Sequence, residues 1–216
     1  SFIMLLFNCS IVSANSATFH HTMQIALSPD TSEIRVTDRI TIPDALLDDH
    51  QSIALEFFLH TGLSVTDVSG ATIEADENEI ALKSRPISIR HYRVTLPPQQ
   101  REFTLQFSGK IHHAVQGPGQ EYSRSFGSTP GVISPEGVFL ASASAWYPHF
   151  GDALVSFQLE IQLPPGWDAV SQGALLRESK TDTAKTVVWE EKQPRKSRTS
   201  RETTASVGRS STTTGR

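Results

Sequence analysis

The stretch Val155-Ser156-Phe157-Gln158-Leu159-Glu160-Ile161-Gln162-Leu163 decides the fold class. Five apolar side chains alternate strictly with four polar ones, and successive side chains on a β-strand point to opposite faces. This stretch therefore predicts a strand with one buried face and one solvated face. Such alternation is typical of antiparallel sheets, because strands of parallel sheets are covered on both faces and are apolar throughout.

The same period of two recurs along most of the chain, for example in residues 33–42, where Asp38 is the one polar break on the apolar face, and in residues 102–111. Pro and Gly clusters separate these runs at the spacing of about 8–12 residues that is typical of β-sandwiches. No stretch has a convincing helical stripe, and residues 112–136 form one long irregular piece. The sequence predicts an all-β, large and mostly antiparallel sandwich-like or saddle-like domain. The strands are expected at 19–28, 33–42, 52–59, 63–68, 71–75, 79–83, 88–96, 102–111, 137–142, 154–163, 168–173 and 185–190.

The two ends of the chain differ in composition from residues 18–194, which we predict to be the folded domain. Residues 1–17 carry no charge and combine an apolar run with small residues, as the hydrophobic and cleavage regions of a secretory signal peptide do. Cleavage is expected after Ala14 or Ala17. The alternative is a buried first strand. The predicted location is outside the cytoplasm, either periplasmic or at the cell surface or secreted.

Residues 195–216 hold six Lys or Arg, one Glu and eleven Ser or Thr, with no aromatic residue. Such a segment buries too little apolar surface to offset the entropy cost of ordering, so we expect a disordered tail. A second interpretation is that this tail has left its reading frame after the strand that contains Trp189. Without the tail, the other 194 residues carry a net charge of −9, which argues against nucleic acid as a partner.

A search for reactive motifs finds none. The chain has a single cysteine, Cys9, no His-Glu-x-x-His, no Gly-x-Ser-x-Gly and no phosphate-binding glycine loop. The adjacent histidine pairs at 20–21 and 112–113 point to opposite faces of an extended strand, so neither pair can chelate one ion. Residues 76–79 are acidic but lack the spacing of a calcium loop, and we expect a hydrated hairpin turn there. Residues 48–50 are expected to form a loop. We predict no catalytic residue and no metal ligand.

The order of these segments resembles the N-terminal β domain of the aminopeptidase N family. These zinc metallopeptidases include membrane alanyl aminopeptidase and leukotriene hydrolase. The resemblance covers about residues 18–194 and rests on an ordered set of segments, none of them diagnostic alone: 20–29, 33–43, 53–59, 63–65, 92–97, 103–111, 137–140, 146–148, 155–167 and 169–173. It implies a non-catalytic domain that packs against a catalytic domain of the same polypeptide. That domain, absent from this sequence, would hold the zinc ion and hydrolyse N-terminal residues from peptide substrates.

The chain departs from the family pattern where many members place a Gln or Glu that binds the substrate's amino group. Residues 141–145 contain neither, so no substrate-binding residue is carried over, and an intact relative has either unusual specificity or no activity. The aromatic cluster that follows is open to two interpretations, namely packing in the core or between domains, and one wall of a peptide groove. Its members are Trp146, Tyr147, Pro148, His149 and Phe150.

Two further functions stay open from the sequence. One is a stand-alone exported β-sandwich module that binds protein or carbohydrate ligands through residues 112–136 and the aromatic cluster. The other is a polyanion binder that acts through the basic tail. The negative net charge of the other 194 residues and the expected export argue against the latter.

Overall fold

The alternating segments form strands in the computed structural model, which describes residues 17–82, 87–113 and 129–196, and the backbone of residues 204–209. Short 3-10 turns are the only helical elements of this described part (η1, Pro29–Thr31; η2, Asp44–Leu46; η4, Ser142–Ser144), and none is long and apolar enough to span a membrane. The strands are β1 (Thr18–Ser28), β2 (Glu33–Thr41), β3 (Ile53–His60), β4 (Leu63–Ser69), β5 (Thr72–Ala81), β6 (Ser88–Leu96), β7 (Glu102–Lys110), β8 (Gly131–Ser134), β9 (Gly137–Ala141), β10 (Leu154–Leu163), β11 (Trp167–Val170), β12 (Ala174–Lys180), β13 (Lys185–Lys196) and β14 (Thr204–Arg209).

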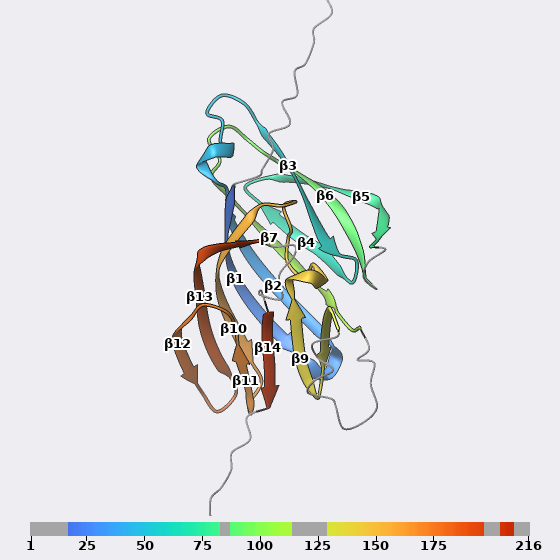
Figure 1. Cartoon of the computed structure of the whole chain (residues 1–216), viewed down its shortest axis with the longest axis vertical. Coiled ribbons are helices and arrows are strands. Elements are labelled where there is room, and N and C mark those ends of the chain that lie inside the picture. The colour runs from blue at the N-terminus through green and yellow to red at the C-terminus, as the bar shows by residue number, and fades with distance from the viewer. Residues whose placement is uncertain (1–16, 83–86, 114–128, 197–203, 210–216) are drawn as a thin grey trace, which may run out of the picture.

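The strands form three sheets (Figure 1). The largest has seven strands in the order β12-β13-β10-β1-β2-β7-β4, the second has the order β11-β14-β9-β8, and the third has the order β3-β6-β5. β1 and β10 run parallel, whereas the other ladders between the described strands are antiparallel. The all-β, mostly antiparallel prediction is therefore confirmed.

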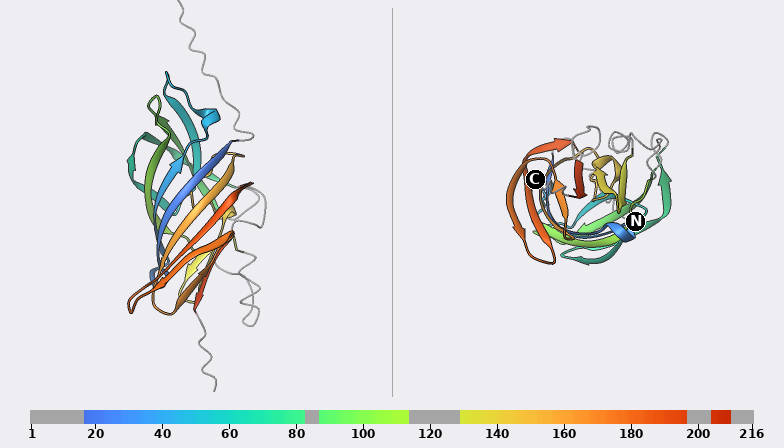
Figure 2. Two further views of the ribbon diagram at one scale, coloured as in Figure 1. Left: turned by 90° about the vertical axis from the view of Figure 1, so that its left-hand side faces the viewer. Right: turned by 90° about the horizontal axis from the view of Figure 1, so that it is seen from below.

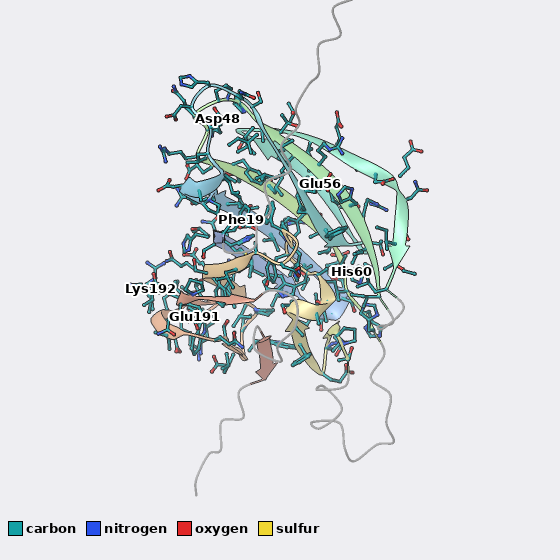
Figure 3. The ribbon with its side chains drawn as sticks, turned by 45° about the horizontal axis from the view of Figure 1, so that its top comes forward. Phe19, Asp48, Glu56, His60, Glu191 and Lys192 are labelled. Atoms are coloured by element: carbon teal, nitrogen blue, oxygen red, sulfur yellow. The ribbon has the colours of Figure 1, made fainter. Side chains whose placement is uncertain are left out.

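The seven-stranded sheet is curved, and the strands of the second sheet lie on its concave side (Figure 2). This arrangement buries the apolar face of each alternating strand. In β2, for example, Ile34, Val36 and Ile40 are almost completely buried, and so are Phe103, Leu105 and Phe107 in the neighbouring strand β7. The main apolar core lies between the sheets and also includes residues of β3 and β6, and Figure 3 shows Phe19 of β1 within it.

Three local features differ from the sequence-based expectations. Residues 72–81 form the single strand β5 with an irregular register between Ala75 and Glu79, instead of two strands joined by a hairpin turn. Asp76 lies in this irregularity and accepts hydrogen bonds from the backbone and side-chain amides of Asn78, which lower its pKa. β8 and β12 were not predicted as strands.

The C-terminal segment expected to be disordered has described backbone in two places. β13 extends to Lys196, and residues 204–209 form β14 between β9 and β11. The rest of residues 195–216 and the predicted signal-peptide segment up to residue 16 lie outside the described residues, as does most of the irregular piece, residues 114–128.

Candidate functional site

The backbone of residues 145–150 is fixed to strand β3. The carbonyl of Ala145 accepts a hydrogen bond from the His60 amide at 2.8 Å. Further along, His149 and Phe58 exchange two backbone hydrogen bonds, each 3.0 Å long. Ala145 ends the η4 turn in the left-handed conformation (φ 54°), so the chain reverses there and leads the aromatic cluster into the interior.

The five residues of the aromatic cluster are all buried within this chain. Phe150 stacks on Phe19 with ring centroids 4.1 Å apart and planes 7° apart. Trp146 meets Tyr147 edge to face at 5.1 Å, and Tyr147 packs against His149 at 4.5 Å. Core packing is thus the role that the structure gives these side chains. Whether the segment also forms the wall of a groove stays a prediction.

A buried histidine–carboxylate pair lies beside this cluster. The Nδ1 of His21 in β1 is 2.7 Å from Oδ2 of Asp38 in the adjacent strand β2, and both side chains are completely buried. The rings of Tyr147 and Phe150 lie 5.6 Å and 6.2 Å from the imidazole of His21. The polar break at Asp38 was visible in the sequence, but its partner lies on another strand, so the pair could not be predicted from periodicity alone.

Three buried polar atoms of this region have no hydrogen-bond partner among the described residues, namely Nε2 of His21, Oδ1 of Asp38 and Nε1 of Trp146. A catalytic histidine exchanges a proton with a nucleophile or substrate through its free ring nitrogen. In His21 that nitrogen faces the closed core, where no substrate can reach it. The pair is therefore suited to linking β1 to β2 and not to general acid–base catalysis.

A second pair joins His60, the last residue of β3, to His113, which follows β7. Their Nε2 atoms are 2.8 Å apart, and the Nδ1 of His60 accepts a hydrogen bond from the Gly62 amide at 2.8 Å. Because Nδ1 accepts, the neutral ring of His60 carries its hydrogen on Nε2 and donates it to Nε2 of His113. Burial, and secondarily the neighbouring His113, lower the pKa of His60 to about 4. Figure 3 shows His60 at the end of β3.

The donor groups of the described residues do not fit a zinc site. Within the described part of the chain, no three His, Cys, Asp or Glu side chains converge on a position that could hold a metal ion. The His60–His113 pair is also unsuited to metal binding, because the Nε2 of His60, which faces His113, is the ring nitrogen that carries the hydrogen. In β1, His20 contacts Ser156 whereas His21 contacts Asp38, as expected for neighbours that point to opposite faces.

The loop predicted at residues 48–50 is present. Oδ1 of Asp48 accepts hydrogen bonds from the backbone amides of His50 and Gln51, at 2.7 and 3.0 Å. This is the hydrogen-bonding pattern of an Asx turn. These carboxylate contacts are local and exposed, so they shape the loop and form no reactive site.

No protein-family model matches the sequence, and no curated protein matches it. The fold, however, is similar to part of solved M1 zinc metallopeptidases. One from Deinococcus radiodurans aligns with a TM-score of 0.54 at 11% identity, and a mutant of an M1 zinc metallopeptidase from the same organism, bound to a Tyr-Ser-Ala substrate, aligns at 0.53 and 12%. A two-domain M1 mutant bound to L-tryptophan aligns at 0.50 and 13%. The alignments cover 88% of this chain but only 41% of those chains. The fold of this chain therefore resembles that of part of an M1 zinc metallopeptidase.

Proposed function

We propose that this chain is the non-catalytic N-terminal domain of an exported zinc aminopeptidase-like protein. The observation that carries the proposal is the fold match, which spans 88% of this chain and two fifths of the M1 structures. In this proposal a catalytic domain of the same polypeptide holds the zinc ion and cleaves N-terminal residues from peptides. Residues of the present chain would supply a docking surface and a rigid support for that domain.

An exposed apolar group is consistent with such a surface. Val170, Leu175 and Leu176 lie within seven residues at the end of β11 and the start of β12, and they are 58%, 46% and 52% exposed. We call these three residues the β11–β12 apolar patch. β12 is an edge strand of the seven-stranded sheet, so its outer backbone groups are also available to another domain.

The first experiment measures hydrolysis of aminoacyl-p-nitroanilides by the purified 216-residue chain. No turnover is expected, because none of the described residues forms a metal site or an accessible acid–base pair. Turnover that a chelator abolishes would overturn the proposal of a non-catalytic domain.

The second experiment tests the β11–β12 apolar patch by sedimentation velocity. The wild-type chain is expected to self-associate through this patch, and Leu176→Ser should reduce that association. Ser179→Ala, which changes an exposed residue of the same strand, is the matched control and should leave association unchanged. A wild-type chain that stays monomeric at high concentration would favour the stand-alone binding module instead.

Export is the third part of the proposal, and one backbone contact supports one of the two expected cleavage points. The Ala17 carbonyl accepts a hydrogen bond from the Leu154 amide at 2.9 Å, and Ala17 is buried. Cleavage after Ala14 keeps this contact, which supports Ala14 over Ala17. N-terminal sequencing of the protein recovered from a secreting host should therefore begin at Asn15. A chain that retains residues 1–14 and stays in the cytoplasm would contradict export.

A further inference from the structure

We propose that the His60–His113 pair is an acid-sensitive contact that holds the three sheets together at neutral pH and releases on acidification. His60 ends β3 of the three-stranded sheet. His113 follows β7 of the seven-stranded sheet, and its backbone amide is bonded to the Gly131 carbonyl of β8 in the remaining sheet. The side-chain hydrogen bond thus joins β3 to the segment after β7, and a separate backbone hydrogen bond joins that segment to β8.

Next to this pair, the backbone of the turn between β3 and β4 lies very close to the backbone of β7. The turn between β3 and β4 places Gly62 against β7, where its carbonyl accepts the Lys110 amide at 2.9 Å. A Cβ at position 62 would collide with the Lys110 carbonyl oxygen and press on the ring of His60. The Gly62 amide also donates a hydrogen bond to Nδ1 of His60. The position and the tautomer of His60 are both fixed by this glycine.

Protonation of either ring breaks this arrangement. A proton on Nδ1 of His60 displaces the hydrogen bond from Gly62, and a proton on Nε2 of His113 sets two N–H groups against each other. The two groups that act electrostatically on the pair are histidines as well, since His113 acts on His60 and His112 acts on His113. Two nearby cations have acidic partners of their own, Arg90 with Glu79 and Lys110 with Glu33. His149, in the segment bonded to β3, packs against Tyr147.

The pKa shifts agree with this geometry. Burial lowers the pKa of both His60 and His113 below the ordinary value, to about 4 for His60. When the His60–His113 contact opens, the two rings become exposed to water and their pKa values return toward about 6.5. Between these values the open form binds a proton that the closed form does not, so the opening equilibrium constant should rise by up to about tenfold for each pH unit of acidification.

Hydrogen–deuterium exchange of the full chain tests the contact. After correction for the intrinsic pH dependence of exchange, amides in residues 58–63 and 110–113 should open about 15-fold more at pH 5.0 than at pH 6.5. Amides of β10, residues 154–163, should change far less. An equal change in both regions, or no change at 58–63 and 110–113, would overturn the proposal.

Variants separate titration from simple structural support. His60→Asn keeps an acceptor for the Gly62 amide but does not titrate, so it should reduce the acid-induced opening. His50→Asn makes the same change at an exposed loop histidine and should behave as wild type. As a readout that requires no variant, NMR of the wild-type imidazoles should show His60 as the Nε2–H tautomer at pH 7. Titration of His60 near 6.5 in the folded protein, or undiminished acid opening in a folded His60→Asn variant, would contradict the proposal.

Discussion

At the scale of single residues, the buried pair of His21 and Asp38 is the most consequential polar feature of the core. Both side chains are fully buried, and each leaves one polar atom without a hydrogen-bond partner among the described residues. Removing one member of a buried pair leaves the other uncompensated in an apolar environment, whereas removing both does not. The free energy of unfolding should therefore respond very differently to single and double substitutions.

Asp38→Leu alone is expected to lower the free energy of unfolding by about 3–5 kcal/mol, because His21 is left buried without its acceptor. The double variant His21→Leu/Asp38→Leu should be destabilised by clearly less than the sum of the two single variants. Urea denaturation of the four proteins closes this double-mutant cycle. Strict additivity would show that the two side chains do not interact.

The lowered pKa of His60 should make the free energy of unfolding decrease as the pH falls. Its pKa is lowered to about 4 in the folded protein, so the unfolded chain binds the proton more readily between pH 6.5 and 4. The contribution of His60 to the free energy of unfolding is therefore fully present above about pH 6.5. It is lost as the pH falls toward 4, by up to about 3 kcal/mol. Denaturation curves at pH 7.0, 6.0 and 5.0 should show the decline. The decline should be smaller in His60→Asn, and an unchanged slope in that variant would assign it to other groups.

At the scale of elements, Lys185 joins three strands near the free edge of the seven-stranded sheet. From the start of β13 its Nζ lies 2.9 Å from Oδ1 of Asp168 in β11 and 2.8 Å from Oε1 of Glu178 in β12. The two carboxylates raise the pKa of Lys185, and the hydrogen bond from Lys185 lowers the pKa of Asp168. The Lys185 side chain is mostly covered, whereas both carboxylates are about half exposed, so solvent weakens each ion pair.

Lys185→Met keeps the packing of the aliphatic stem but removes both ion pairs. We expect a loss of about 0.5–1.5 kcal/mol in the free energy of unfolding, most of it absent at high salt. Lys192→Met, which removes the ion pair of the exposed Lys192 with the partly buried Glu190 on the same strand, is the matched control and should cost less than about 0.5 kcal/mol. Thermal unfolding at low and high salt makes the comparison. Equal effects of the two substitutions would contradict a special role for Lys185.

At the scale of the whole molecule, the parts of the fold that were predictable are those whose burial has a period of two. β1, β2, β7 and β10 each bury one face, and their expected ranges agree with the structure to within a residue. β12 could not be recognised because every residue of this edge strand is exposed, and β8 because all four of its residues are buried. Neither pattern alternates, so neither carries the signal of a half-buried strand.

The pairing of distant segments was likewise beyond the reach of sequence patterns. Periodicity gives the two faces of a strand but not its neighbour, so the parallel pairing of β1 with β10 was not anticipated. His60 and His113 are 53 residues apart and meet only because β3 and β7 end at the same place. The aromatic cluster at 146–150 was visible as a composition, whereas its burial within this chain depends on its attachment to β3.

The central claim, that this chain is the first domain of an aminopeptidase-like protein, is tested most directly by the DNA that encodes it. We would sequence from codon 185 onward and translate every reading frame downstream. The account predicts a frame that continues the strand around Trp189 and then encodes Gly-x-Met-Glu-Asn and His-Glu-x-x-His. A confirmed stop after codon 216, with neither motif in any downstream frame, would contradict the account.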